Sequence, residues 1–156
     1  MLKAANITKK FGENTVLNNF SREFADCKVT AVLGKSGCGK STLLNVLMGL
    51  IAPDSGEVLR GENERISAVF QEDRLCENLT ASANIRLVTG KRYTRERIAA
   101  ELAEVGLADC ADKPVRELSG GMKRRTALLR ALLAEYDVLF LDEPFKGLDA
   151  DTKRIV

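Results

Sequence analysis

The sequence predicts an α/β fold built on a mostly parallel sheet, and three observations lead to this prediction. An apolar run at residues 29–33 ends at a glycine-rich turn and is followed by apolar residues at helical spacing over 40–50. A second helical pattern, over 122–134, gives way to the solidly apolar run 138–141. A strand that is apolar at every position suits a parallel sheet that is covered on both faces. Strand, helix and strand in this order therefore predict a layered α/β architecture.

The first part of the chain is expected to contain short strands followed by one helix. Residues 1–33 alternate apolar and polar residues in short runs, which is typical of strands. The helix that follows is expected to end near Gly49, because glycine often occupies the position after the last helical residue. Pro53 and Gly56 predict a turn, since proline presets one backbone dihedral and glycine accepts a positive one.

The rest of the chain is expected to contain mainly helices between two strands. The first of these strands is predicted at 66–70, and residues 72–118 are predicted to be largely helical. The clearest helix is 95–105, which places three apolar residues on one face: Ile98, Leu102 and Val105. The helix over 122–134 is expected to have an apolar side formed by four leucines: Leu128, Leu129, Leu132 and Leu133.

Composition narrows the class of protein. A chain of 156 residues suits one domain with its own core, and 45% hydrophobic with 29% charged residues is ordinary for a soluble globular protein. The sequence has no run of about twenty apolar residues, the length that a membrane-spanning helix needs. Its N-terminus also lacks the apolar stretch of a signal peptide. We therefore expect a cytoplasmic protein whose membrane role, if it has one, is supplied by a partner.

The charge pattern does not favour nucleic-acid binding. The net charge is +2, from 24 basic and 22 acidic side chains, and only 5% of the residues are aromatic. A dedicated nucleic-acid binder usually has a stronger imbalance or a basic stripe. We interpret the densest basic cluster, Lys123, Arg124 and Arg125, as a solvated helix face. No nucleic-acid partner is expected.

Cysteine and histidine usage limits the available chemistry. The four cysteines lack the spacing of a metal or redox pair, and they are expected to be free thiols: Cys27, Cys38, Cys76 and Cys110. The sequence has no histidine, which removes the commonest metal ligand and the commonest general base. Catalysis is therefore expected to depend on carboxylates, lysine, backbone amides and a bound metal ion.

The glycine-rich turn matches the phosphate-binding pattern GxxxxGK[ST]. Its glycines let successive amide protons converge on an anion, and the following helix presents its positive end to the same point. Lys40 is expected to contact the β- and γ-phosphates of ATP, and Ser41 to bind Mg²⁺ through its hydroxyl. The predicted ATP-binding loop consists of nine residues: Gly34, Lys35, Ser36, Gly37, Cys38, Gly39, Lys40, Ser41 and Thr42.

An acidic pair follows the buried strand at 138–141. Ligands in open parallel sheets bind beyond the carboxyl ends of the strands, which is where Asp142 and Glu143 stand. Asp142 is a candidate ligand of Mg²⁺, which prefers oxygen donors. Glu143 is a candidate catalytic residue that orients or deprotonates the attacking water. Pro144 is expected to move Glu143 away from helical geometry and to end the strand.

A second anion-binding helix start is predicted at Ser119, Gly120 and Gly121. Serine and two glycines before a long helix leave backbone amides exposed, although a plain helix cap would have the same pattern. With Met122 these residues read LSGGM. Together with the phosphate loop and the acidic strand end, this sequence resembles the ATP-binding cassette family, whose signature is LSGGQ and whose Walker B strand resembles Val138–Glu143.

The resemblance implies further parts of the site. Gln71, which follows the strand at 66–70, resembles the family's Q-loop glutamine, which contacts Mg²⁺ and the transport partner; it therefore joins Lys40 and Glu143 as a catalytic candidate. Residues 147–149 resemble the D-loop. Phe11 stands where the family places the aromatic residue that stacks on adenine, although an isolated phenylalanine is more often part of a core.

The resemblance also implies a fold and an assembly. The fold is a P-loop NTPase core with an N-terminal antiparallel β subdomain and a helical subdomain at about 72–118, in a single nucleotide-binding domain spanning 1–156. Two cassettes, identical or different, dimerise head to tail, so that Ser119, Gly120 and Gly121 serve the partner's ATP. The implied partners are transmembrane permease subunits and a solute-binding protein. The implied location is the cytoplasmic face of the cell membrane.

Two departures from the family pattern affect the expected activity. Met122 replaces the usual glutamine, and we expect weaker binding to the partner's nucleotide. The family's switch histidine is absent, and the interpretation is a domain that is incomplete at its C-terminus, with an uncovered sheet edge and some exposed apolar surface. The 156-residue chain is therefore expected to bind ATP and to hydrolyse it poorly.

Three functions follow from these observations. The leading one is the ATPase subunit of a transporter, and Phe70 to Leu75 resemble the Q-loop region of bacterial importers for nitrate and sulfonates. The second is a soluble cassette ATPase acting on DNA or ribosomes, but residues 72–118 leave no room for a coiled coil or zinc module. The third is a nucleotide-binding module without turnover.

Overall fold

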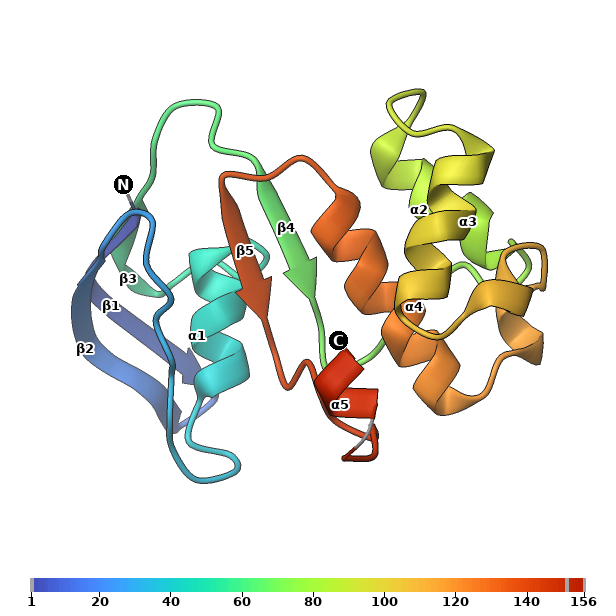
Figure 1. The fold of residues 1–156 in the computed structure, drawn as a ribbon. Coiled ribbons are helices and arrows are strands. Elements are labelled where there is room, and N and C mark those ends of the chain that lie inside the picture. The colour runs from blue at the N-terminus through green and yellow to red at the C-terminus, as the bar shows by residue number, and fades with distance from the viewer. Residues whose placement is uncertain (1, 151, 156) are drawn as a thin grey trace. The chain divides into compact units, whose positions relative to one another are not determined.

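The computed structural model describes residues 2–150 and 152–155, which fold as two compact units, Met1–Glu64 and Arg65–Val156 (Figure 1). Among these residues, none of the helices combines the length and the apolar character that a membrane span requires.

A three-stranded antiparallel sheet and one helix make up the first unit. The sheet has the order β2-β1-β3, formed by β2 (Asn14–Phe24), β1 (Leu2–Phe11) and β3 (Ser55–Leu59). Leu2 and Ala4 are buried two residues apart, and a register shift after Ala4 returns Ile7 to the core. Helix α1 (Lys40–Leu47) buries its apolar residues at helical spacing: Leu43, Val46 and Leu47. The antiparallel β subdomain implied by the family resemblance is therefore present.

Two parallel strands and most of the helices make up the second unit. Strands β4 (Ile66–Val69) and β5 (Val138–Leu141) pair in parallel, with Val69 opposite Leu141. Buried side chains of the predicted helical region and of α4 form one apolar core: Ala81, Ile85, Ile98, Leu102, Val105, Leu107, Cys110, Val115, Leu118, Leu129 and Leu133. The helices are α2 (Ala81–Thr89), α3 (Arg95–Glu104), α4 (Gly120–Leu133) and α5 (Thr152–Ile155), with short 3₁₀ turns at Ala108–Cys110 and Val115–Glu117.

Helix boundaries follow the sequence signals closely. Thr80 and Thr94 cap α2 and α3 by accepting a hydrogen bond from a backbone amide three residues later, as N-cap threonines do. Helix α1 ends where Gly49 was expected to end it: this glycine has a φ of 76°, and its amide donates to the carbonyl of Val46. The predicted glycine of the following turn, Gly56, also has a positive φ of 80°.

Two expectations for individual elements were wrong. Residues 29–33 form no strand, and Val29 and Leu33 are 100% and 89% exposed. A strand is held by hydrogen bonds to a neighbouring strand, and the described ladders of the sheets do not include this segment. Leu132 does not belong to the apolar side of its helix, because Ala131 occupies the buried position instead. The other three leucines of that helix are buried as expected.

Candidate functional site

The phosphate-binding loop precedes α1 in the first unit, and its backbone has the conformation that the glycines predict. Gly37 and Gly39 have φ values of 78° and 97°, a region that residues with a Cβ rarely adopt. Gly39 is the N-cap of α1, and no side chain caps this helix start. The first backbone N–H groups of α1 therefore remain free of a side-chain cap and can donate to an anion, and the helix dipole favours negative charge at the same point.

Lys40 folds back across this loop. Its ammonium group donates hydrogen bonds to the carbonyl oxygens of Gly34 at 2.9 Å and Lys35 at 2.8 Å, and it lies 4.0 Å from the sulfur of Cys38. These carbonyl acceptors are neutral, so they orient the ammonium group without cancelling its charge. The loop thus presents a full positive charge beside a row of amide donors, which is the arrangement that binds a phosphate group.

The loop packs tightly against β2 and against itself. A Cβ added at Gly39 would lie 2.7 Å from Cγ1 of Val16, and one added at Gly34 would lie 2.6 Å from the sulfur of Cys38. Close approach therefore disfavours a Cβ at both positions, and at Gly39 the left-handed backbone disfavours it as well. The contact with Val16 places the end of the loop beside the first residues of β2, which follow the hairpin that begins after Phe11.

Phe11 lies at the end of β1, and its ring is exposed rather than packed in the core. Its side chain is 51% exposed, and the Lys9 ammonium lies 5.6 Å from the ring centroid. Asp54 holds this end of β1, because its carboxylate accepts a hydrogen bond from the Lys10 amide at 2.6 Å and one from the Lys9 ammonium at 2.9 Å. The Lys10 amide bond, followed by the bond from Lys9, lowers the pKa of Asp54. An exposed ring on an anchored strand end suits stacking on a base.

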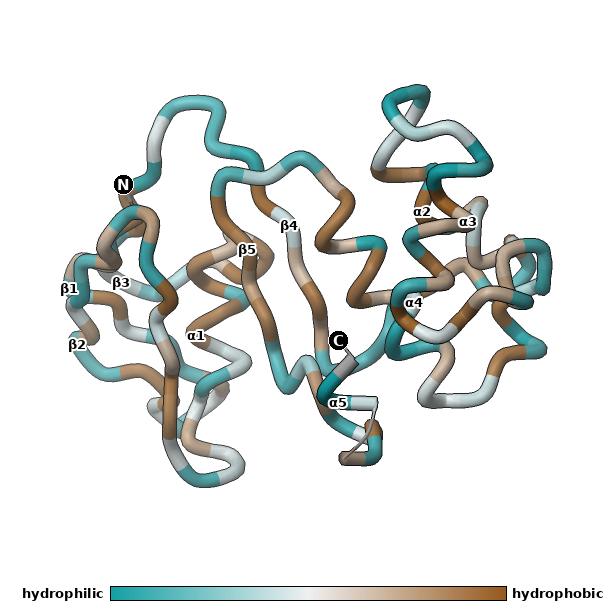
Figure 2. The backbone as a smooth tube through the Cα atoms, in the orientation of Figure 1, coloured by the Kyte–Doolittle hydropathy of each residue, from teal (hydrophilic) through white to brown (hydrophobic). Residues whose placement is uncertain are grey.

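In the second unit, the structure brings Gln71, Asp142 and Glu143 to one edge of the parallel sheet. Asp142 and Glu143 directly follow β5, and Gln71 lies two residues after β4. The Asp142 amide donates to the Val69 carbonyl at 2.9 Å, so the parallel ladder continues to the point where both chains leave the sheet. Figure 2 shows the hydrophobic run of β5 ending in hydrophilic residues at this carboxyl end.

Glu143 has an unusual backbone. Its φ is 48°, a left-handed conformation that costs a residue with a Cβ roughly 1–2 kcal/mol. Pro144 explains why Glu143 leaves the right-handed helical region, since proline disfavours that region in the residue before it. The Glu143 carboxylate is half exposed, and one of its oxygens lies 3.5 Å from the Lys146 ammonium. A strained backbone carrying an accessible carboxylate is typical of functional positions.

The helix that begins after Ser119 has an open N-terminus. The Ser119 hydroxyl accepts a hydrogen bond from the Met122 amide at 3.3 Å, and α4 continues for 14 residues. A Cβ added at Gly120 would meet no atom within 4 Å, so this side of the helix start is unobstructed. Met122 is half-buried against the apolar core of the helices. The start of α4 is therefore a conventional N-cap with open space beside Gly120.

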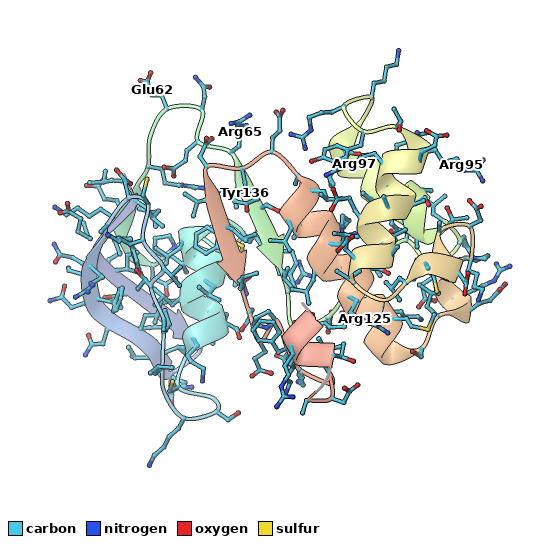
Figure 3. All side chains as sticks on the ribbon, viewed as in Figure 1. Glu62, Arg65, Arg95, Arg97, Arg125 and Tyr136 are labelled. Atoms are coloured by element: carbon cyan, nitrogen blue, oxygen red, sulfur yellow. The ribbon has the colours of Figure 1, made fainter. Side chains whose placement is uncertain are left out.

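The interpretation of Lys123, Arg124 and Arg125 as a solvated helix face was wrong. Arg124 is buried and hydrogen-bonded, Lys123 pairs with Glu77 at 2.9 Å, and Arg125 donates to the Val105 carbonyl at 2.8 Å. Figure 3 labels Arg125 where its side chain leaves α4. The sequence contains a signal for Arg124 that charge counting misses: it lies three, four and seven residues before the buried Ala127, Leu128 and Ala131, on the same face of α4.

Each of the two units contains residues whose chemistry suits a nucleotide or its magnesium ion. In the first unit, the amides at the start of α1 and the Lys40 ammonium suit phosphate oxygens, and the Ser41 hydroxyl is an exposed oxygen donor. In the second unit, the half-buried Asp142 carboxylate and the exposed Gln71 amide are oxygen donors at one sheet edge. Hydroxyl, carboxylate and amide oxygens are the ligands that Mg²⁺ accepts beside phosphates.

Comparisons with known proteins give a matching family model and several similar sequences. A family model described as ABC transporter matches residues 17–146. The aliphatic sulfonates import ATP-binding protein SsuB 1 of Agrobacterium fabrum is 42% identical over 152 residues, which is 95% of this chain and 55% of that protein. The protein of the same name from Pseudomonas syringae is 43% identical over 145 residues, covering 93% of this chain and 61% of the relative. The chain thus spans little more than half the length of these relatives.

Two solved structures are similar over nearly the whole chain. A dimeric structure of MJ0796, described as a bacterial ABC transporter cassette, has a TM-score of 0.82 at 30% identity and is matched over 99% of this chain and 79% of its own. A post-hydrolysis state of the same cassette, bound to ADP and phosphate, has a TM-score of 0.84 at 30% identity with the same coverage.

Proposed function

This chain belongs to the ABC transporter family, and from that premise we propose that it binds ATP with Mg²⁺ and hydrolyses it to drive a solute across a membrane. The observation that carries the proposal is the Lys40 ammonium held on the carbonyls of Gly34 and Lys35 beside the uncapped start of α1. This geometry supports a site for the β- and γ-phosphates of a nucleotide. Phe11, exposed at the end of β1, is proposed to stack on the adenine.

The second unit supplies the groups proposed to act on the bound nucleotide. Asp142 and Gln71 are each proposed as an oxygen ligand of Mg²⁺, which would neutralise phosphate charge when bound. Ser41 is proposed as an oxygen ligand of Mg²⁺ because of its place after Lys40 in the phosphate-binding pattern. Glu143 is proposed to orient and deprotonate the attacking water. Its accessible carboxylate and its position beyond the carboxyl end of β5 support this role.

A second cassette is proposed to complete the site. The accessible start of α4, with an unobstructed Gly120, suits the γ-phosphate of a nucleotide bound by a partner. The matched cassette MJ0796 is described as dimeric, which supports this assembly. The remaining proposed partners are membrane-spanning permease subunits and a solute-binding protein, which would place the chain at the cytoplasmic face of the membrane.

Import is the proposed direction of transport. Both of the relatives described above are named as import proteins for aliphatic sulfonates, and they are more than 40% identical to this chain. Small sulfonates are therefore the first solutes to test.

Two measurements on one variant test the proposed hydrolysis and its coupling to transport. Glu143→Gln is expected to keep MgATP binding and to abolish phosphate release, because the amide cannot accept the proton of the attacking water. In cells that carry the complete transporter, the same variant is expected to abolish uptake of a radiolabelled aliphatic sulfonate. Undiminished phosphate release would show that Glu143 does not activate the attacking water. Sulfonate uptake that survives the loss of hydrolysis would contradict the coupling of hydrolysis to transport.

A further inference from the structure

Arg124 is a buried cation in the second unit. It lies in α4, five residues after Ser119, and only 4% of its side chain is exposed. A guanidinium group has five N–H donors in a fixed plane. Here its three nitrogens donate to four backbone carbonyls and one carboxylate: Pro144 O at 2.8 Å, Phe70 O at 2.6 Å, Asp73 Oδ1 at 3.2 Å, Asp142 O at 3.1 Å and Glu143 O at 2.5 Å.

These five acceptors belong to two segments of the candidate site. Phe70 and Asp73 flank Gln71, and their bonds hold the chain that leaves β4. The other three acceptors are the backbone carbonyls of residues 142–144, the segment after β5 that contains Glu143. One rigid planar group therefore connects the Phe70 carbonyl and the Asp73 carboxylate, which lie before and after Gln71 in the chain, to the backbone that carries Glu143.

Both segments contain a residue in a left-handed conformation. Glu143 has a φ of 48° and Arg74 has a φ of 46°. Such conformations persist only where the surroundings fix them. Arg130, further along α4, adds hydrogen bonds to the carbonyls of Asp73 at 3.2 Å and Arg74 at 2.8 Å. Helix α4 thus holds both strained segments through the side chains of its arginines.

We infer that Arg124 is a positioning residue, which holds the backbones of the Gln71 and Glu143 segments at a fixed separation and ties both to the helix that starts at Ser119. The inference rests on the proposed function, in which Gln71 and Glu143 act on a bound nucleotide. The shape of the side chain is essential to this role. A lysine would keep the charge, but its compact ammonium group has three donors and cannot reach acceptors in two segments with the geometry of the planar fork.

Hydrogen exchange measures this positioning without nucleotide. In Arg124→Lys, peptides covering 70–76 and 142–148 are expected to exchange about tenfold faster than in the parent chain, because segments with fewer constraints open more often. Arg125→Gln is the matched control: this neighbouring arginine donates to the carbonyls of Val105 and Gly106, and to Gly121 in its own helix, and these bonds involve neither segment. Unchanged exchange in Arg124→Lys, or the same increase in Arg125→Gln, would overturn the inference.

Enzyme kinetics then connect the positioning to hydrolysis. Arg124→Lys is expected to lower kcat by about ten- to a hundredfold, the cost of a misplaced catalytic group, while the Kd for MgATP stays within about threefold. The control is expected to keep kcat within about twofold, even where its thermal midpoint falls as far as that of Arg124→Lys. A parent-like kcat in Arg124→Lys would contradict the inference. A parent chain that neither binds nor hydrolyses ATP would instead contradict the proposed function, while the exchange experiment would still decide whether Arg124 positions the two segments.

Discussion

Replacing Gly39 by alanine tests how the phosphate loop is held against β2. Two costs can be estimated from the structure. The left-handed backbone, with a φ of 97°, costs an alanine roughly 1–2 kcal/mol. The new Cβ would also lie 2.7 Å from Cγ1 of Val16 and 3.1 Å from its carbonyl oxygen. Relieving such a contact in a packed region costs roughly 1–3 kcal/mol, so the total expected for Gly39→Ala is about 2–5 kcal/mol of unfolding free energy.

Gly37 provides the matched control, because its φ of 78° is also left-handed but a Cβ there would meet no atom within 4 Å. Gly37→Ala should therefore cost only the backbone term of roughly 1–2 kcal/mol. Urea unfolding measures this difference: with a slope of about 2 kcal/mol per molar, Gly39→Ala should lower the urea midpoint by about 1–2.5 M and Gly37→Ala by about 0.5–1 M. In the double variant Gly39→Ala, Val16→Ala, the loss of unfolding free energy should be about 1 kcal/mol smaller than the sum of the two single losses, because the contact is relieved. Equal losses in the two glycine variants would refute the role of the Val16 contact.

Three further predictions concern the second unit. The Arg65 side-chain bonds lower the pKa of Asp137 to about 2. The stability that Asp137 contributes is therefore complete above its unfolded pKa, near pH 4, and is lost as the pH falls toward 2. The difference in urea midpoint between the parent and Asp137→Asn should shrink over that pH range, and a constant difference would contradict this prediction. Asn84 is fully buried and accepts from the Cys76 amide, so Asn84→Ala should cost about 2–4 kcal/mol, whereas a cost under about 0.5 would show that the lost bond is replaced. Ser119→Ala removes the N-cap hydroxyl and should lower the unfolding free energy by about 1 kcal/mol, whereas Ser119→Asp should stay close to the parent. Equal losses in the two variants, measured by thermal unfolding, would show that the side-chain cap does not stabilise the helix.

The parts of the fold with strong local signals could be predicted from the sequence. The fully apolar run of β5 identified a parallel strand, and its acidic pair was correctly expected at the carboxyl end. Gly49 and Gly56 adopt the positive φ values that helix ends and turns require. The loop at 34–42 has the positive-φ glycines and the following helix that its continuous pattern predicts. Each of these signals depends on neighbours in the sequence.

The errors involve contacts between distant residues. The segment 29–33 has the composition of a strand, but a strand also needs a hydrogen-bonded partner, which local sequence does not specify. Arg124 was grouped with its charged neighbours, whereas its actual partners lie 18 to 54 residues away. Those partners are mostly backbone carbonyls, which leave no mark in the sequence. Only the helical spacing from Arg124 to the buried Ala127, Leu128 and Ala131 indicates that its side chain points inward.

Calorimetric titration of MgATP into the chain, compared with two lysine variants, tests the central claim most directly. Lys40→Ala removes the ammonium group that is held on the loop carbonyls, and Lys28→Ala removes an exposed positive charge outside the loop. We expect saturable binding to the parent chain and to Lys28→Ala, and a loss of about a hundredfold or more in Lys40→Ala, because a charge-assisted phosphate contact disappears with its desolvated partner left in place. Equal affinity in Lys40→Ala and the parent, or no binding by a folded parent chain, would contradict the assignment of the phosphate loop.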